Sequence, residues 1–249
     1  MKIQVVTLFP EVFKDFFKTS IIGRAQAKKL VELEAILLRD FAKDKHRKCD
    51  DYPYGGGPGM VLKPEPIIEC FTKLQAKGKR VIYPSASGRL YHQGYASDLA
   101  REKEFIILCG HYEGLDQRII DYYVTDEISI GDYILSGGEV AAMVIIETVV
   151  RLLEGAINAE SHEFESLKDG LLEYPQYTRP RIVLDMSVPE VLLNGNHAEI
   201  QRWRMQKSIA KTALYRPELL ERAKQKQELR LLIEEYYQRE AKYGFNQGT

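Results

Sequence analysis

Cysteine is scarce in this chain of 249 residues, and its three cysteines, Cys49, Cys70 and Cys109, stand far apart with no C-x-x-C pair. The five histidines do not join them at metal-ligand spacing. The sequence therefore predicts neither a disulfide framework nor a zinc site. Because unpaired cysteines are typical of a reducing compartment, we expect a cytoplasmic protein.

Long apolar runs are also missing. No segment approaches the roughly 20 residues that a membrane-spanning helix needs. The first residues contain Pro10, Glu11 and Lys14, which no secretory signal would carry in its apolar region. We expect no membrane partner. The glycine run 55–59 lacks the Lys-Ser/Thr of a P-loop, and no G-x-G-x-x-G follows a predicted strand. This disfavours a nucleotide-dependent oxidoreductase.

Net charge is nearly absent as well, at −1, but its distribution is uneven. Residues 201–226 hold eight Lys/Arg against two Asp/Glu, and residues 39–48 hold five against two. Positive patches on a neutral protein indicate a localised anionic partner. With 45 % hydrophobic and 29 % charged residues, the chain is globular, and its length suits one large domain or one with a smaller companion.

Short strand-like runs, among them the apolar and β-branched-rich 105–109, alternate with helical patterns in the first part of the chain. We expect strands at 3–9, 33–38, 80–83, 105–109 and 124–129, and helices at 11–18, 22–29, 64–74, 91–101 and 139–153. This order predicts an α/β fold, a mostly parallel sheet with helices on both faces. The helix at 139–153 is apolar nearly all round, which indicates burial, including burial at a subunit contact.

The alternation ends at the polar stretch 155–170, which has the composition of a linker. A small all-α domain follows, with helices beginning near Asn196, at Pro217 and at 227. Asn196 and the glutamate three residues on predict a capping box. Trp203 is interpreted as a core residue, and Arg204, Lys207 and Lys211 form a basic stripe.

The segment 105–139 contains two strand ends followed by glycines. Gly110 and Gly114 bracket a turn that carries Glu113, and ligands of open α/β sheets bind at the carboxyl ends of strands. We expect a ligand held largely by main chain. Glu113 either faces that ligand or pairs with Arg118. The glycine run 55–59, flanked by basic residues, Tyr52 and a second tyrosine, is either a surface for a base or phosphate or a plain turn.

Five blocks in order along the whole chain carry a family resemblance: GGGPGM at 55–60, CGHYEGLDQR at 109–118, SIGDYILSGGE at 129–139, YTRP at 177–180 and LLNGNHAEIQRWR at 192–204. Together they resemble the bacterial tRNA (guanine-N1)-methyltransferases. The resemblance implies methylation of N1 of guanine 37 in tRNA, next to the anticodon. It also implies a homodimer with shared active sites and a deep trefoil knot at the C-terminal end of the α/β domain, as in the SPOUT methyltransferases.

By this resemblance, residues 1–157 form the knotted domain that binds S-adenosylmethionine, 158–170 a flexible linker, and 171–249 a helical domain that binds tRNA. The donor would be held by Tyr83, Pro84, Ser85, Gly110, Tyr112, Gly114, Ile130, Gly131, Asp132, Tyr133, Ile134, Leu135, Gly137 and Gly138. The tRNA would contact Gly55, Gly56, Gly57, Gly59, Arg204, Lys207 and Lys211.

The resemblance also implies the catalytic groups. Methyl transfer to N1 needs its proton removed while charge builds on O6, and a carboxylate base and an arginine meet those needs. Arg151 is the implied arginine, and Glu113 lies near the donor. The family's aspartate base in a D-S-F motif is replaced here by Glu165 in E-S-L, with Asp169 as the alternative. A magnesium requirement is implied too, without a dedicated ligand cluster. A tRNA-binding protein that has lost its base is the second reading.

Overall fold

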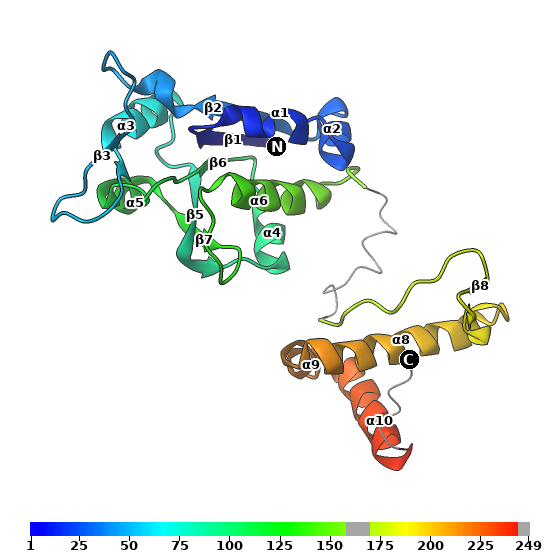
Figure 1. Cartoon of the computed structure of the whole chain (residues 1–249). Coiled ribbons are helices and arrows are strands. Elements are labelled where there is room, and N and C mark those ends of the chain that lie inside the picture. The colour runs from blue at the N-terminus through cyan, green and yellow to red at the C-terminus, as the bar shows by residue number, and fades with distance from the viewer. Residues whose placement is uncertain (158–169, 244–249) are drawn as a thin grey trace. The chain divides into compact units, whose positions relative to one another are not determined.

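Five parallel strands form the central sheet of the first part of the chain (Figure 1). Their order is β2 (Glu32–Leu37), β1 (Lys2–Thr7), β6 (Glu104–Leu108), β5 (Arg80–Leu90) and β7 (Asp126–Ser129). The structure is a computed structural model that describes residues 1–157 and 170–243, with side chains described through residue 238. It divides into two compact units, residues 1–158 and 159–249, which we call the α/β unit and the helical unit. The predicted α/β architecture with a parallel sheet is confirmed, whereas the trefoil knot stays a prediction.

The elements of the α/β unit are β1 (Lys2–Thr7), η1 (Pro10–Val12), α1 (Phe13–Phe16), α2 (Ser20–Ala27), β2 (Glu32–Leu37), η2 (Leu38–Phe41), β3 (Asp50–Asp51), β4 (Val61–Leu62), α3 (Pro64–Lys73), β5 (Arg80–Leu90), α4 (Gln93–Leu99), β6 (Glu104–Leu108), α5 (Gln117–Tyr123), β7 (Asp126–Ser129) and α6 (Glu139–Arg151). Those of the helical unit are β8 (Ile182–Val183), β9 (Met186–Ser187), η3 (Glu190–Leu192), α8 (His197–Tyr215), α9 (Pro217–Ala223) and α10 (Gln227–Tyr243).

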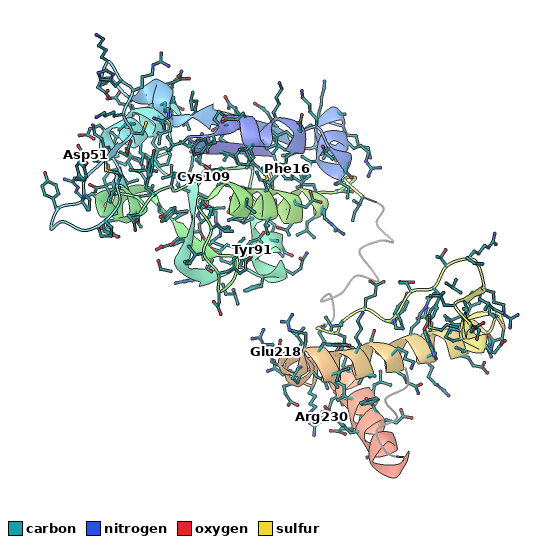
Figure 2. The ribbon with its side chains drawn as sticks, in the orientation of Figure 1. Phe16, Asp51, Tyr91, Cys109, Glu218 and Arg230 are labelled. Carbon is teal, nitrogen blue, oxygen red and sulfur yellow. The ribbon has the colours of Figure 1, made fainter. Side chains whose placement is uncertain are left out.

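Helices cover both faces of the sheet. Successive strand residues point to opposite sides, so neighbouring residues of one strand pack against different helices. On one face Ile3 and Val5 of β1 pack with α2, α4 and α6. On the other, Val6 of β1 packs with α3 and α5. Cys109, which follows β6, is 1 % exposed and lies in the interior (Figure 2). Both faces of the strands are therefore buried, which explains their continuous apolar runs.

A network of half-buried polar contacts lies at the start of β5 and β7. Arg80 donates from Nε and Nη2 to the two carboxylate oxygens of Asp126, each at 2.9 Å. Asp126 also accepts from Thr125 and from Tyr95. Arg80 is the first residue of β5 and Asp126 the first of β7. The network therefore lies at the edge of the sheet opposite the strand ends where the sequence predicts the ligand site.

Helix α6 is buried within this chain on one side only, so the expectation that a subunit contact completes its burial stays a prediction. Its inner face is fully covered, but Val140 and Val144 are 53 % and 38 % exposed. Spacings of four, three and four residues place them on one stripe with Glu147 and Arg151. The helix thus has an uncovered apolar stripe within this chain.

Sequence patterning misses α5 and two hairpins of two-residue strands, β3-β4 and β8-β9. The second hairpin means that the unit after the linker is not purely helical. The capping box is half correct. The side chain of Asn196 accepts from the backbone N–H of Glu199 at 3.3 Å, but the Glu199 carboxylate accepts from Asn194 at 2.8 Å.

Candidate active site

A cavity of about 280 Å³ lies at the carboxyl ends of β6 and β7, beside the part of β5 where its pairing with β7 breaks register. Parallel strands present unpaired backbone groups at this edge, which is where ligands of open α/β sheets bind. The volume is just below the roughly 300–1,000 Å³ typical of small-molecule pockets. Its walls come from residues 83–86 of β5, from the segments 110–114 and 128–138, and from the first turn of α6. The three stretches of sequence that contain the expected donor-binding residues therefore meet in space.

The structure places nearly all of the expected donor-binding residues around this cavity. Those that line it are Tyr83, Pro84, Ser85, Gly110, Tyr112, Gly114, Ile130, Gly131, Tyr133, Ile134, Leu135, Gly137 and Gly138. Asp132 is exposed and is not among the lining residues, although both its neighbours in the chain come close to the cavity. The arrangement brings together thirteen positions that span 56 residues of sequence.

Glycine is required where two walls of the cavity touch. A Cβ on Gly110 would lie 2.8 Å from Cε2 of Tyr83, and the carbonyl of Gly110 accepts from the N–H of Gly138 at 2.9 Å. Burial raises the pKa of the Tyr83 phenol, so the ring stays neutral beside the cavity. Tyr112 has φ +58°, a left-handed conformation uncommon for a bulky residue. The turn is thus tightly constrained.

Glu113 faces the end of the glycine run and not Arg118. Its backbone N–H donates to the carbonyl of Met60 at 2.9 Å, and a Cβ on Gly59 would lie 2.4 Å from its Oε1. Arg118 instead pairs with Asp116, from Nη2 at 2.7 Å and from Nε at 2.9 Å. The alternative in which Arg118 neutralises Glu113 is therefore wrong, and the carboxylate lines the cavity.

The rest of the glycine run projects into open space. Gly55, Gly56 and Gly57 all have positive φ, and a Cβ on any of them would meet nothing within 4 Å. Tyr52 is 78 % exposed and Tyr54 is fully exposed. A flat ligand beside the cavity would find backbone and aromatic surface here, held by the β3-β4 pairing at its base.

Two further polar residues lie in or next to the cavity wall: the sequence reasoning placed His111 beside the suspected site without a role, and it did not single out Glu139. Glu139, the first residue of α6, is 8 % exposed and accepts from the hydroxyl of Thr7 at 2.7 Å. His111 lines the cavity, and its Nδ1 is buried without a hydrogen-bond partner among the described residues. For Glu139 the only sequence signal was its place at the end of a recognised block, because burial of a carboxylate leaves no pattern in a single sequence.

Arg151 lies at the opposite end of α6 from the cavity. The helix contributes Gly138 and Ala141 to the cavity wall, and Arg151 is its last residue. At 1.5 Å per residue, the ten residues from Ala141 to Arg151 span about 15 Å. Arg151 therefore does not reach the cavity of its own chain. The two candidate bases, Glu165 and Asp169, fall outside the residues that the structure describes.

The basic stripe of the helical unit is only partly free to bind an anion. Lys207 and Lys211 on α8 are exposed. Arg204 is half-buried, and its guanidinium carbon lies 4.8 Å from the ring centroid of Tyr174. The sequence could show the helical spacing of these cations, but not that one of them is held against a ring.

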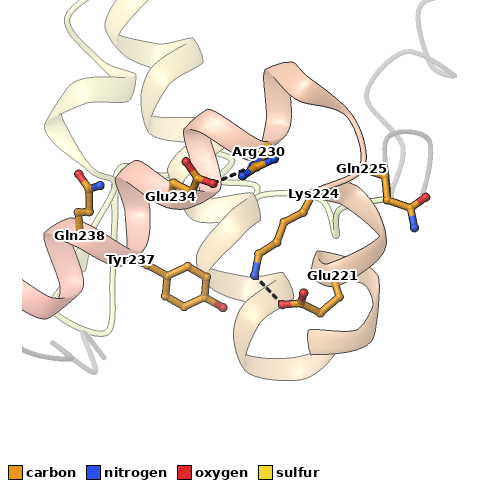
Figure 3. A pocket seen from close by; sticks show the side chains of 7 residues that line it. All are labelled: Glu221, Lys224, Gln225, Arg230, Glu234, Tyr237 and Gln238. Atoms are coloured by element: carbon orange, nitrogen blue, oxygen red, sulfur yellow. Dashed lines mark hydrogen bonds and ion pairs between the residues drawn. The ribbon is translucent and has the colours of Figure 1, made fainter.

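A wider hollow of about 510 Å³ lies between α9 and α10 (Figure 3). Its two cations are already paired, Lys224 with Glu221 at 2.6 Å and Arg230 with Glu234 at 2.8 Å. The Nζ of Lys224 also lies over the ring of Tyr237, 5.4 Å from its centroid. Both positive charges in this hollow are neutralised by neighbouring glutamates. The smaller cavity at the strand ends is therefore the better candidate site.

Two further observations bear on partners. Among residues 1–157 and 170–243, no three His, Cys, Asp or Glu side chains gather as a group that could hold a metal ion. Within the same ranges, no helix is both long enough and apolar enough to cross a membrane.

The amino-acid sequence matches one family of known proteins over most of its length. The family described as tRNA (Guanine-1)-methyltransferase TrmD matches residues 1–222. A tRNA (guanine-N(1)-)-methyltransferase of Treponema denticola is 52 % identical over 224 residues, which cover 90 % of this chain and 92 % of that protein. Its counterpart in Caldicellulosiruptor saccharolyticus is 51 % identical over 235 residues, 94 % and 96 % of the two chains. That of Dictyoglomus turgidum is 50 % identical over 236 residues, with the same coverage.

Proposed function

The chain belongs to the tRNA (guanine-1)-methyltransferase family, and on that premise we propose that it methylates N1 of guanine 37, next to the anticodon, with S-adenosylmethionine as donor. The enzyme class, a tRNA (guanine-N1)-methyltransferase, follows from the family. The position within the tRNA rests on the five sequence blocks. The observation that carries the rest is the backbone-lined cavity at the strand ends. Action in the cytoplasm is part of the proposal.

The cavity fits a donor that is recognised mainly by main chain. Gly110 and Gly138 let two loops approach so closely that side chains there would collide with Tyr83 and with Cys109. The loop 130–138 contributes Gly131, Gly137 and Gly138 to the lining, and glycine has only main chain to offer a ligand. Glu113 adds one negative charge, which suits the positive charges of S-adenosylmethionine. When bound, this donor supplies a methyl group that is already activated by its sulfonium.

The chain's own residues would manage the proton and the charge on guanine. Neutral guanine carries a proton on N1, so N1 becomes nucleophilic only as that proton leaves, and negative charge then grows on O6. We assign the proton to the carboxylate of Glu165, with Asp169 as the alternative, and the interaction with O6 to Arg151. A base and a positioned cation together are suited to this single displacement without a covalent enzyme intermediate.

The active sites would be shared between two copies of the chain. Arg151 lies about 15 Å of helix away from its own cavity, on the same stripe of α6 as the exposed Val140 and Val144. An apolar stripe that ends in the required arginine is best covered by a second copy, because that contact would bury the valines and bring Arg151 to the partner's cavity. We therefore propose a homodimer.

Product identification tests the function. The enzyme is incubated with an unmodified tRNA transcript and methyl-labelled S-adenosylmethionine, and the RNA is digested to nucleosides. We expect 1-methylguanosine from a transcript with guanine at position 37 and none when only position 37 is changed. A ribose-methylated product, or methylation that follows guanine 36, would contradict the proposal. Tight tRNA binding without any product would favour the second reading, a binding protein that has lost its base.

A further inference from the structure

An aromatic pair in the helical unit joins the segment after the linker to helix α8. The ring centroids of Tyr177 and Trp203 lie 6.3 Å apart with their planes at 54°. Tyr177 is 49 % exposed, so one side of the pair faces solvent. Trp203 is half-buried and is not among the residues of the described core cluster of this unit, which contains Ile209, Leu220 and Ile233. The interpretation of Trp203 as a core residue is therefore not supported.

The position of this pair is fixed by two further contacts along α8. The N–H of Leu172 donates to the hydroxyl of Thr212 at 2.8 Å, and Tyr174 lies under Arg204. The segment 172–177 thus runs antiparallel to the helix, and Tyr177 is its third point of contact. A ring held in this way loses little conformational freedom when a ligand stacks on it.

Cations border the exposed ring pair. Lys207 lies one helical turn beyond Trp203 on the same side of α8, and it is exposed. Arg204 carries a buried Nε without a hydrogen-bond partner among the described residues, and it is half-buried over Tyr174. An exposed aromatic face beside a positive charge matches the needs of an unpaired nucleotide, which offers a flat base and a phosphate.

We propose that Tyr177, backed by Trp203, is a stacking platform for an unpaired base of the RNA substrate, with Lys207 placed to contact a neighbouring phosphate. This inference rests on the proposed function for the identity of the RNA. It adds a base-binding site in the helical unit that shares no residue with the cavity of the α/β unit. A base in a duplex is already stacked on both sides, so the platform selects loop nucleotides.

Trp203 is the only tryptophan of the chain, so its fluorescence reports on this site alone. The full-length protein is titrated with a 17-nucleotide anticodon stem–loop RNA and, in parallel, with an RNA duplex of similar charge. For the wild type we expect the stem–loop to change the Trp203 emission and the duplex to leave it nearly unchanged. Affinities are measured independently by filter binding, because some variants alter the fluorescence itself.

Three variants separate stacking from folding and from charge. Tyr177→Ala should weaken stem–loop binding about 5- to 150-fold, the range that corresponds to roughly 1–3 kcal/mol for one base–aromatic stack. Tyr177→Phe keeps the ring and should bind like the wild type. Tyr215→Ala, which removes a 66 % exposed tyrosine at the end of α8, is the matched control and should have no effect.

The inference is overturned if Tyr177→Ala binds the stem–loop as tightly as the wild type, if stem–loop and duplex binding fall equally, or if Tyr177→Phe is as weak as Tyr177→Ala. Donor affinity of each variant is measured as well, and we expect it to be unchanged. A failure of the platform leaves the wild-type yield of 1-methylguanosine intact. A failure of the proposed function would instead abolish that yield. The stem–loop affinities of the variants would still show whether Tyr177 stacks on a base.

Discussion

Gly59 packs directly against Glu113, so closely that a Cβ on Gly59 would lie 2.4 Å from Oε1 and 2.5 Å from Cγ of the carboxylate. Gly59 also has φ +82°, a conformation that costs a residue with a side chain about 1–2 kcal/mol. We expect Gly59→Ala to displace the carboxylate and to lower kcat/KM for tRNA by roughly 10- to 100-fold, the scale of an ångström-sized misplacement. Initial rates on a tRNA transcript measure it.

The control for this prediction is Gly57→Ala. Gly57 has φ +124° and open space around it, so the substitution introduces backbone strain without a collision. Its rate should fall much less than that of Gly59→Ala. Equal losses would mean that the shape of the glycine run matters and its contact with Glu113 does not.

Shared active sites predict complementation between two inactive variants. Arg151→Ala should remove the cation that faces O6, and Gly110→Ala should close the cavity, since its Cβ would lie 2.8 Å from the Tyr83 ring. Each homodimer should be inactive. In a mixed dimer, one site combines the intact cavity of the first chain with the intact arginine of the second. Co-expressed and purified heterodimers should therefore regain activity, up to about one site in two.

Complementation fails if Arg151 acts within its own chain. Every site of the mixed dimer would then carry one defect, and the heterodimer would be as inactive as the parents. Donor binding to each parent provides the control, because Arg151→Ala should retain it and Gly110→Ala should lose it.

The choice of base predicts a difference between two conservative variants. Glu165→Gln removes the carboxylate but keeps the size of the side chain, so we expect the rate of methyl transfer to fall about 100- to 10,000-fold, as for the loss of a general base. Donor affinity should not change. Asp169→Asn should cost much less, and Glu163→Gln serves as the matched control nearby. Single-turnover rates measure all three, and the reverse order would assign the proton to Asp169.

The network around Arg80 predicts a dependence of stability on pH. Burial alone would raise the pKa of Asp126, but hydrogen bonds from Arg80, Thr125 and Tyr95 outweigh it and hold that pKa below its usual range. A carboxyl whose folded pKa is lowered stabilises the fold above its unfolded pKa of about 4, and this stabilisation is lost as the pH falls through the folded value. The contribution is therefore complete at neutral pH.

Asp126→Asn should lower the free energy of unfolding at pH 7 by roughly 1.5–3 kcal/mol, the worth of hydrogen bonds to a charged group. The difference from the wild type should shrink as the pH falls below about 4. Urea denaturation followed by circular dichroism measures it. Asp98→Asn is the control, since its ion pair with Arg101 is long, at 3.6 Å, and exposed. A constant difference across this pH range would contradict the assignment.

The strands and the cavity could be predicted because their signals are local. Five short runs, mostly apolar, correctly predicted the five strands of the sheet, and glycines at strand ends marked segments that meet there. Strand β5 continues to Leu90, beyond the expected end, with a break in register between Pro84 and Arg89. The small residues in that break are typical of a loop, so the sequence did not predict a strand there. Two of them, Ser85 and Ala86, line the cavity.

Other features depend on contacts that a single sequence does not encode. The β8-β9 hairpin turns at Leu184 and Asp185, both with positive φ, where a turn signal would be Asn or Gly. Arg118 could have paired with Glu113 or with Asp116, and only the packing of α5 decides between them. The resemblance assigned Arg151 and the cavity residues to one active site. The length of α6 separates them within one chain, and that separation becomes visible only in the structure.

Helix α6 holds the cavity wall at its first residues and Arg151 at its last, and a helix is too stiff to fold back on itself. Under the proposed mechanism, an isolated chain would bind the donor and still be unable to use it. Specific activity should then decline on dilution, as dimers dissociate, while the donor dissociation constant per chain stays the same. Protein concentration would thus control turnover without any dedicated regulatory site.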